Sequence, residues 1–384
     1  MKIMLLAGEV SGDLHASRLA RELQSLNPDL KLAGTGGYYL QRSGVQLIGE
    51  DISLTNTIGL TEALPFVAQK YNFVKKKLIP FFMEWRPQAV VFIDNQGMNV
   101  PLAKTFRKLR PHTILIYYFP PLAWIWGRGT GKKVAELVDL ILSPHPQDHE
   151  FYKSVGGNSV FVGHPFAQIY PSPPSEIEKA EMKKSIGFDP EKPAVAVLPG
   201  SRYQEVKTLT QPLIDAAQII SSEIPEVQYF LPVAHPSLEE RIKKFLEKFK
   251  NSSIKVLPYR EGILKAADVA MGTSGTTSLE LAYLGIPQVA TYRVSWLTYF
   301  IGRLIVNSNY ITLPNIFLNE EVICELLQDI NPGKIAGLMI RLLKNRDFYK
   351  QKKEKLLKVR VLLGEGKTIR KAAQEILEFI RRNL

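Results

Sequence analysis

The first half of the chain alternates short apolar runs with amphipathic stretches. The apolar runs have the length of β-strands and carry little charge, and they occupy residues 2–7, 89–93, 114–118, 138–142 and 159–162. Between the first two of these runs, residues 14–26 place Leu19, Leu23 and Leu26 on one side of a helix. Continuous apolar strands are typical of sheets that are covered on both faces. The alternation therefore predicts a doubly wound parallel sheet of the α/β class.

The pattern breaks in a segment rich in proline and serine, residues 170–176, and then starts again. New strand-like runs follow, with helical stretches between them, at 194–198, 227–231, 254–257, 269–271 and 288–291. A chain of 384 residues is also longer than one core usually supports. We predict two domains with Rossmann-like sheets, 1–168 and 169–355, followed by C-terminal helices in 356–384.

Composition narrows the class of protein. Hydrophobic residues make up 45% of the chain, as in globular proteins. The net charge of +12 favours acidic partners such as phosphorylated ligands, nucleic acid or an anionic membrane. The single cysteine, Cys324, fits a reducing cytoplasm. Because the apolar run at 2–7 is too short for a signal peptide and no uncharged stretch is long enough to span a bilayer, we expect a soluble or peripheral protein.

The first candidate site is the turn that follows the first predicted strand. Gly8 and Gly12 allow a tight turn and the approach of a ligand, and Ser11 or Asp13 can cap the next helix. The spacing is not that of a dinucleotide-binding loop, and the carboxylates of Glu9 and Asp13 would repel a pyrophosphate. We expect this turn to contact sugar hydroxyls on the acceptor side. The ordinary alternative is a capped turn without a ligand.

The second candidate site follows the predicted strand at 194–198. Gly200 and Ser201 would expose backbone N–H groups at a helix start, where an anion is favoured, and Glu205 lies in the first turn of that helix. Arg202 adds donors that suit a diphosphate. The alternative is an arginine with a purely structural partner.

The third candidate site follows the predicted strand at 269–271. The hydroxyl and N–H groups of Ser274, Gly275 and Thr276 can surround phosphate oxygens, and Glu280, one helical turn further, can accept hydrogen bonds from ribose hydroxyls. A helix with a Ser/Thr cap and no ligand is the simpler interpretation. Two anion-suited turns at the carboxyl ends of strands in one domain nevertheless favour a nucleotide diphosphate site.

Asp94 directly follows the apolar strand at 89–93 and should therefore lie at the ligand edge of the first sheet. A carboxylate in this position can accept the proton of an attacking hydroxyl group. The competing interpretation is an N-cap for the helix that follows.

Residues 58–87 interleave apolar and aromatic side chains with lysines and contain more apolar surface than one core-facing stripe needs. This pattern is typical of a membrane interface or an acyl-chain groove. A buried core helix with a solvated run of lysines explains it equally well. The candidate membrane or acyl contacts are Leu64, Phe66, Val67, Phe73, Phe81 and Phe82.

His145 and His149 are spaced like a pair of metal ligands, but they lie in a proline-containing turn without an evident third ligand. We assign no metal. A Ser-His-Asp hydrolase is not supported, because the chain has no Gly-x-Ser-x-Gly elbow.

The chain resembles lipid-A-disaccharide synthase, a bacterial glycosyltransferase family of the GT-B architecture. The resemblance runs in order through nearly the whole chain and is carried by residues 8–13, 93–99, 121–126, 162–164, 198–202 with Glu205, 274–276 with 279–280, 292–293, 313–315 and 325–328. It implies two Rossmann-like domains with a cleft between them and C-terminal helices that pack back on the N-terminal domain. Residues 58–87 fall where the family meets the membrane.

The resemblance also implies a reaction. The donor would be UDP-2,3-diacylglucosamine and the acceptor 2,3-diacylglucosamine 1-phosphate (lipid X). The products would be the β-linked lipid A disaccharide 1-phosphate and UDP, formed with inversion and without a metal or another cofactor, on the cytoplasmic face of the inner membrane of a Gram-negative cell. The family's catalytic aspartate falls on Asp94 and its donor-side arginine on Arg202. Glu9, Asn315 and Gln328 fall on positions that the family uses for substrate or activity, and a homodimer is compatible with this picture.

The sequence departs from the family pattern at several positions. Val10 replaces the usual alanine of the first motif, and Gly97 replaces a second carboxylate that often follows the catalytic aspartate. Pro121 and Leu122 stand in the usual Ser-Pro-Ser run, and residues 145–148 replace the usual Leu-Pro-Phe-Glu. These differences concern acyl-chain preference and acceptor geometry more than the class of reaction.

Two other functions fit parts of the sequence. A UDP-sugar epimerase or another lipid-linked glycosyltransferase on the same scaffold would share the nucleotide turn, and an epimerase would need no acceptor. A non-catalytic basic protein that binds membranes or nucleic acid would gather basic residues on one face. We find no RNA-binding module, so this second alternative is weaker.

Overall fold

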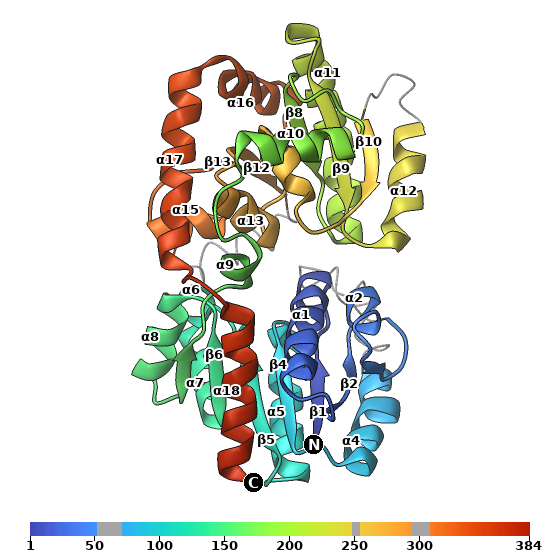
Figure 1. The fold of residues 1–384 in the computed structure, drawn as a ribbon, viewed down its shortest axis with the longest axis vertical. Coiled ribbons are helices and arrows are strands. Elements are labelled where there is room, and N and C mark those ends of the chain that lie inside the picture. The colour runs from blue at the N-terminus through green and yellow to red at the C-terminus, as the bar shows by residue number, and fades with distance from the viewer. Residues whose placement is uncertain (52–70, 248–253, 294–307) are drawn as a thin grey trace. The chain divides into compact units, whose positions relative to one another are not determined.

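The computed structural model describes residues 1–384 apart from 52–70, 248–253 and 294–307 (Figure 1). The described residues form two compact units. The first unit contains the described residues up to Ile169 together with Leu363–Leu384, and the second contains the described residues from Tyr170 to Leu362. The sequence placed the corresponding domain ends at 168 and 355. Residue 355 lies inside an unbroken helix, Arg346–Leu362, so the C-terminal part of the first unit begins later in the chain than expected.

The first unit is built on a seven-stranded sheet with the order β3-β2-β1-β4-β5-β6-β7, in which all neighbours are parallel. The strands are β1 (Lys2–Leu6), β2 (Lys31–Thr35), β3 (Gln46–Leu47), β4 (Ala89–Ile93), β5 (Ile114–Tyr118), β6 (Leu140–Ser143) and β7 (Ser159–Phe161). All five strands predicted for this half are present. β2 and β3 had no sequence signal, because β2 contains Gly34 and β3 is only two residues long.

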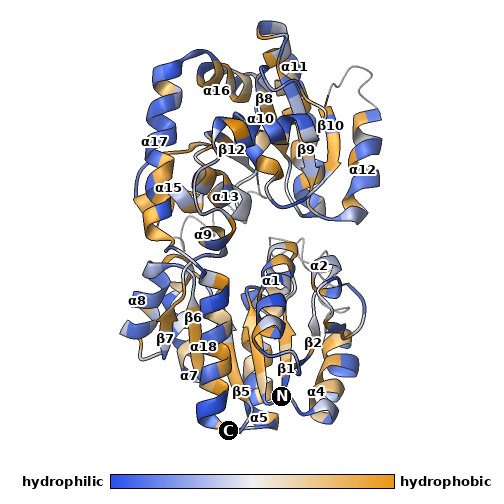
Figure 2. Cartoon of the chain, viewed as in Figure 1, coloured by the Kyte–Doolittle hydropathy of each residue, from blue (hydrophilic) through white to orange (hydrophobic). Residues whose placement is uncertain are grey.

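Helices cover both faces of this sheet, as the continuous apolar strands predict. They are α1 (Val10–Leu26), α2 (Tyr38–Gln41), a π-helical turn (Val74–Leu78), α4 (Ile79–Trp85), α5 (Gln96–Leu109), α6 (Ala123–Trp126), α7 (Arg128–Leu137), α8 (Pro146–Ser154), α9 (Pro165–Ile169) and α18 (Thr368–Asn383). α1 and α18 pack on one face, and α4, α5, α7 and α8 supply the core of the other. Figure 2 shows the apolar strands between helices with polar outer sides.

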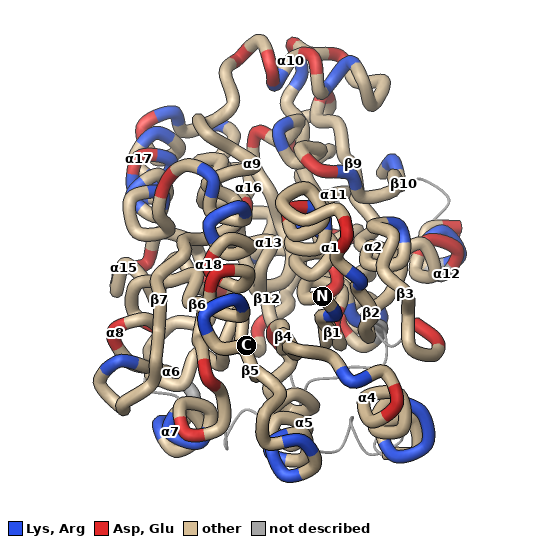
Figure 3. The backbone as a smooth tube through the Cα atoms, turned by 60° about the horizontal axis from the view of Figure 1, so that its bottom comes forward, with Lys and Arg blue, Asp and Glu red and all other residues tan. Residues whose placement is uncertain are grey.

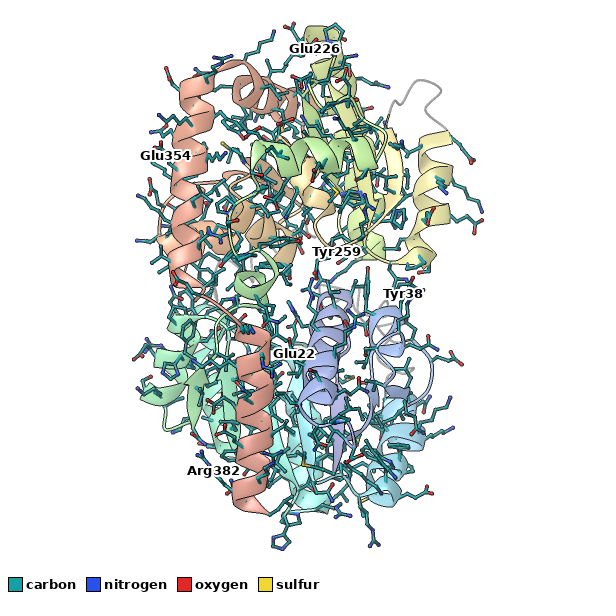
Figure 4. All side chains as sticks on the ribbon, viewed as in Figure 1. Glu22, Tyr38, Glu226, Tyr259, Glu354 and Arg382 are labelled. Carbon is teal, nitrogen blue, oxygen red and sulfur yellow. The ribbon has the colours of Figure 1, made fainter. Side chains whose placement is uncertain are left out.

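The last helix, α18, belongs to the core of the first unit although it lies at the far end of the chain. Its buried residues Ile369, Ala372, Ile376 and Ile380 recur at three- and four-residue spacing and form one stripe. This stripe packs with the apolar side of α1 in one core. Beside it, Arg370 of α18 pairs with Glu22 of α1, which is labelled in Figure 4, at 3.6 Å.

The second unit contains a six-stranded parallel sheet with the order β10-β9-β8-β11-β12-β13. Its strands are β8 (Ala194–Leu198), β9 (Gln228–Val233), β10 (Ile254–Pro258), β11 (Val269–Gly272), β12 (Gln288–Tyr292) and β13 (Cys324–Leu327). Its helices are α10 (Glu176–Ser185), α11 (Tyr203–Glu223), α12 (Pro236–Glu247), a 3₁₀ turn (Ile263–Ala266), α13 (Thr276–Leu284), α15 (Leu313–Leu318), α16 (Pro332–Lys344) and α17 (Arg346–Leu362). The five predicted strands are present, and β13 is additional.

Each sheet has a point at which the strand order reverses, between β1 and β4 in the first unit and between β8 and β11 in the second. Because all strands are parallel, their carboxyl ends meet at one edge, and ligands of such sheets bind beyond that edge at the reversal point. The turns after β1 and β4 carry residues 8–13 and Asp94. The turns after β8 and β11 carry residues 199–202 and 273–276. The topology thus brings the predicted site residues of each unit to one edge of its own sheet.

Within the described ranges, the helices are either too short or too polar to cross a membrane.

Candidate active site

Asp94 stands on a strained turn between β4 and α5. Both Asp94 and Asn95 adopt left-handed backbone conformations, with φ of 53° and 45°. The side-chain amide of Asn99 donates to the carbonyl of Asp94 at 2.8 Å, and the hydroxyl of Tyr117 donates to the same carbonyl at 2.8 Å. Such strain persists only where surrounding contacts over-determine it, and it is concentrated at functional sites. The turn presents a half-buried carboxylate at the reversal point of the sheet.

The turn after β1 lies directly beside Asp94. The hydroxyl of Ser11 donates to Asp94 Oδ2 at 3.4 Å, and Glu9 is the N-cap residue of α1. A Cβ atom at Gly8 would stand 2.0 Å from the side-chain amide of Asn95, so a larger residue here would displace that amide. Glu9, Ser11 and Asp94 are therefore brought to the same edge by neighbouring strands.

Asp13 has a different role from the predicted acceptor contact. Its side chain is fully buried and accepts hydrogen bonds from the backbone N–H groups of Gly37 at 2.7 Å, Tyr39 at 2.8 Å and Leu40 at 3.1 Å. The carboxylate thereby caps the start of α2. Burial raises the pKa of Asp13, and the three backbone hydrogen bonds oppose this rise. The prediction for Asp13 is corrected: it holds the loop after β2 to α1.

The turn after β8 is organised by Glu205. Its Oε2 atom accepts from the N–H groups of Ser201 at 3.2 Å and Arg202 at 3.3 Å, and its Oε1 atom accepts from the Arg202 guanidinium at 2.9 Å. Gly200 has φ of 118°, and a Cβ atom there would stand 2.3 Å from Glu205 Oε2. Of the two N–H groups expected to face a ligand anion, that of Ser201 is bound by a carboxylate of the protein instead. Arg202 remains at the edge as a half-buried, oriented cation.

The turn after β11 has the geometry of an anion site at a helix start. α13 begins at Thr276, with Gly275 as its N-cap residue at φ of 147°. A Cβ atom at Gly275 would meet no described atom within 4 Å, so the N-terminus of α13 is open at this point. The first N–H groups of a helix have no partner within the helix, and its dipole favours an anion there. Ser274 and Thr276 flank this open end, and the turn adjoins the end of β8, because Thr273 N donates to the carbonyl of Leu198 at 2.9 Å.

Glu280 lies on α13 and is buried, with 4% of its surface exposed. Its Oε1 atom accepts from the hydroxyl of Tyr170 at 2.5 Å. The hydroxyl of Tyr259, which follows β10 and is labelled in Figure 4, donates to both carboxylate oxygens at 3.3 and 3.4 Å. Glu280, which was predicted to accept ribose hydroxyls, is thus bound by two tyrosines of the same unit, closely by Tyr170 and loosely by Tyr259.

Asn315 is a structural residue. Its amide donates to the carbonyl of Ile323 at 2.9 Å and to Glu325 Oε1 at 2.7 Å, and its oxygen accepts from two backbone N–H groups, those of Val322 and Ile323, at 2.8 Å each. The side chain is fully buried. Asn315 therefore joins α15 to β13, which corrects its assignment as a substrate contact. Gln328 follows β13 directly at the ligand edge with φ of 63°, and its N–H donates to the carbonyl of Tyr292 at 2.7 Å.

A buried histidine cluster was not found by sequence reasoning. His15, His145 and His164 come from α1 and from the turns after β6 and β7, and their rings pack around Phe119, which stacks on His15 at 4.1 Å. Burial holds the pKa values of His15 and His164 well below the usual range. In the sequence these histidines follow three separate strands, β1, β6 and β7, and their spacing along the chain does not show that they meet.

The two histidines with metal-like spacing point to different partners. His145 Nδ1 lies 2.8 Å from Asp148 Oδ2, whose other oxygen accepts from the indole of Trp124 at 2.9 Å. His149 Nδ1 lies 3.2 Å from the hydroxyl of Ser159. Across the described ranges, His, Cys, Asp and Glu side chains do not gather in threes as metal ligands would.

The predicted membrane segment lies only partly within the described residues. Leu64, Phe66 and Val67 fall outside them. Phe82 is fully buried and stacks on Phe106 at 4.0 Å, so its assignment as a membrane or acyl contact is wrong and it belongs to the core. Phe73 and Phe81 are half-buried and pack against the same core. The neighbouring Lys75, Lys76 and Lys77 are exposed.

The two units, each built on a doubly wound parallel sheet with helices on both faces, have the GT-B architecture. Solved structures share this fold. UDP-GlcNAc 2-epimerase from Neisseria meningitidis has a TM-score of 0.62 at 12% identity, with 100% of each chain covered. MurG from Acinetobacter baumannii has a TM-score of 0.55 at 14% identity, with 99% of each chain covered. At these identities the likeness concerns the fold alone, and it confirms the predicted architecture.

The particular family follows from closer relatives. The family model described as lipid-A-disaccharide synthetase matches residues 3–380. The lipid-A-disaccharide synthase of Anaeromyxobacter dehalogenans (strain 2CP-1 / ATCC BAA-258) is 34% identical over an alignment of 385 positions. The alignment covers 99% of this chain and 98% of the relative. That of Coxiella burnetii (strain CbuG_Q212) is 34% identical over 380 residues, 98% of each chain. The chain belongs to the lipid-A-disaccharide synthetase family of glycosyltransferases, as its motifs predicted.

Proposed function

We propose that this protein transfers a diacylglucosamine group from UDP-2,3-diacylglucosamine to lipid X, releasing UDP and the β-linked lipid A disaccharide 1-phosphate. The observation that carries the proposal is Asp94, whose carboxylate is displayed on a left-handed turn at the reversal point of the first sheet. Membership in the family supports the choice of donor and acceptor.

Asp94 acts as the general base in this proposal. The acceptor hydroxyl oxygen bonds to the anomeric carbon of the donor while its proton passes to the Asp94 carboxylate. The bond between that carbon and the diphosphate oxygen breaks, and UDP leaves with the bonding electrons from the opposite side, which inverts the configuration. Glu9 and Ser11 lie at the same edge of the sheet, and the hydroxyl of Ser11 makes a long hydrogen bond of 3.4 Å to the carboxylate, which an acceptor hydroxyl can replace. General-base groups of this kind contribute about 10²–10⁴-fold to a rate.

The second unit supplies the nucleotide contacts in this proposal. Arg202 and the open N-terminus of α13 at Ser274, Gly275 and Thr276 stabilise the negative charge that grows on the leaving diphosphate. Glu280 accepts from the ribose hydroxyls. Gly200 and Glu205 keep Arg202 in place, and Gln328 lies at the same edge of the sheet.

We further propose that the protein works as a peripheral enzyme on the cytoplasmic face of the inner membrane, where acylated substrates reside. Figure 3 shows Lys and Arg in blue along α5, α7 and the helical segment that runs from the π-helical turn into α4. The lysines on this α4–α5–α7 side of the first unit are exposed. They are Lys75, Lys76, Lys77, Lys104, Lys108, Lys132 and Lys133. Each lysine near an anionic bilayer contributes about 1 kcal/mol of attraction.

The test of the base uses Asp94→Asn, because asparagine tolerates the left-handed backbone that alanine would strain. We expect disaccharide formation, measured by mass spectrometry with acylated UDP-glucosamine and lipid X, to fall at least about 10²-fold while calorimetric UDP binding is retained. Asp29→Asn, an exposed aspartate of the same unit, is the control. Near-normal turnover of Asp94→Asn would refute the base assignment. Conversion of a non-acylated donor without an acceptor would favour the epimerase alternative.

A further inference from the structure

The carboxylate of Glu280 has two tyrosine partners of unequal strength. Tyr170 has 2% of its surface exposed, and its hydroxyl donates to Oε1 at 2.5 Å. Tyr259 is only half-buried and shares its hydroxyl between the two oxygens at 3.3 and 3.4 Å. A short bond to a buried carboxylate fixes its orientation, whereas a long, shared bond is easily replaced by another donor. Tyr170 is therefore the partner that sets the direction of the carboxylate.

Tyr170 is itself fixed at both ends. Its hydroxyl accepts from the N–H group of Gly262 at 3.2 Å. Its carbonyl accepts from the Arg360 guanidinium at 2.8 Å, and another guanidinium nitrogen donates to the carbonyl of Tyr283 at 2.8 Å. The guanidinium also stacks over the Tyr283 ring, 4.1 Å from its centroid. Tyr283 and Glu280 both lie on α13. Tyr170 is therefore joined to this helix twice, directly through Glu280 and indirectly through Arg360, which binds both Tyr170 and Tyr283.

We propose that Tyr170 is a positioning residue for nucleotide recognition, which acts by holding Glu280 in the orientation that accepts the ribose hydroxyls. The inference rests on the donor site of the proposed function. A glutamate side chain has rotatable bonds whose freedom must be lost on binding, and a group that restricts them beforehand raises affinity. In this proposal a ribose hydroxyl takes the place of the half-buried Tyr259 hydroxyl on the carboxylate, while the shorter bond from Tyr170 is kept.

The discriminating measurement is the affinity ratio between UDP and its 2′-deoxy and 3′-deoxy analogues, determined by calorimetry on the full chain. The native protein should bind UDP about tenfold or more tightly than at least one analogue, because a hydrogen bond to a charged group is lost. Tyr170→Phe should reduce this ratio by about threefold or more, chiefly through weaker UDP binding. Tyr259→Phe should change the ratio less than Tyr170→Phe.

Tyr229→Phe is the matched control. Tyr229 is a buried tyrosine of the same unit, with 1% of its surface exposed, and its hydroxyl donates to the carbonyl of Ala217 at 3.1 Å. Removing this hydroxyl should leave the UDP-to-analogue ratio unchanged. In a double-mutant cycle, Tyr170→Phe should have no further effect on the ratio once Glu280→Gln is present, because both changes remove the same oriented acceptor.

The outcomes separate this inference from the proposed function. Native protein that does not bind UDP, or binds UDP and both analogues equally, overturns the donor site and the inference with it. Native discrimination that survives in Tyr170→Phe overturns the inference alone, as does an equal loss of affinity for all three nucleotides. Should Tyr170→Phe fail to fold, Arg360→Met releases the Tyr170 carbonyl instead, and an unchanged ratio in that variant also overturns the inference.

Discussion

The structure assigns Asp13 a purely structural role, which replacement by alanine tests directly. The change removes the acceptor for three backbone N–H groups, those of Gly37, Tyr39 and Leu40, around a fully buried carboxylate. A buried donor that loses its partner costs about 1–3 kcal/mol. Alanine recovers up to about 0.7 kcal/mol as a better helix former within α1. The desolvation that raises the pKa of Asp13 disappears as well, so we expect a net loss at the lower end of the range for three such donors, about 3 kcal/mol.

Urea unfolding measures this loss. The tryptophans among the described residues, at positions 85, 124 and 126, belong to the first unit, so their fluorescence follows that unit. With a slope of about 1–3 kcal/mol per molar urea, the midpoint should fall by roughly 1–3 M. The folded fraction of Asp13→Ala should keep its Michaelis constant for the acceptor, and Asp29→Ala should behave like the native protein. An unchanged midpoint combined with weaker acceptor binding would refute the structural assignment and restore the contact inferred from sequence.

Two further predictions concern pH and membranes. His15 and His164 are buried near Arg18 and His145 with lowered pKa values, so below about pH 6.5 the unfolded chain binds more protons than the folded one, and stability should fall by up to about 2.7 kcal/mol per pH unit. Urea midpoints at pH 7.5 and 5.5 should show this loss. His164→Asn should halve the slope of stability against pH, whereas the same change at the exposed His112 should leave that slope unaltered. A midpoint that does not depend on pH would contradict the inference that neutral histidines are buried. Replacing Lys104 and Lys108 with glutamate should weaken binding to anionic phosphatidylglycerol vesicles roughly tenfold or more. The same change at the exposed Lys350 and Lys358 of α17 should not. Equal effects of the two pairs would contradict membrane docking through the α4–α5–α7 side.

The strands could be predicted because a strand that is buried on both faces has an uninterrupted run of apolar residues in its sequence. All ten predicted strands exist, and the three that were missed show why the signal fails. β2 contains Gly34, where a Cβ atom would stand 1.9 Å from the Leu5 carbonyl. β3 has only two residues. β13 contains Glu325, a charged residue that interrupts its apolar pattern. The Glu325 carboxylate accepts hydrogen bonds from the backbone N–H groups of Ile311 and Thr312, a contact that the local sequence of β13 does not show.

The chemical character of a side chain was easier to foresee than its partner. Asp94 and Glu280 were selected because each follows a strand or opens a helix at the ligand edge, and topology alone puts them there. Asp13 and Glu205 also follow strands, and Asn315 was selected through the family resemblance. All three side chains accept hydrogen bonds from backbone N–H groups of the protein. Phe82 was assigned to a membrane because the sequence around it does not show that it stacks on Phe106 of α5.

The sequence alone therefore specified the doubly wound class and the order of the turns, because strand burial and turn chemistry depend on neighbouring residues. The family was indicated by the resemblance of its ordered motifs. Only the tertiary structure decided which of these carboxylates are buried against backbone N–H groups and which lie at the edge of a sheet. Asp13 lies four residues beyond Glu9, yet one is sealed beneath the loop after β2 and the other stands at the edge beside Asp94. The difference arises from contacts between residues far apart in the chain, such as Asp13 with Gly37 and Tyr170 with Glu280, and pairings over such distances leave no periodic trace in the sequence.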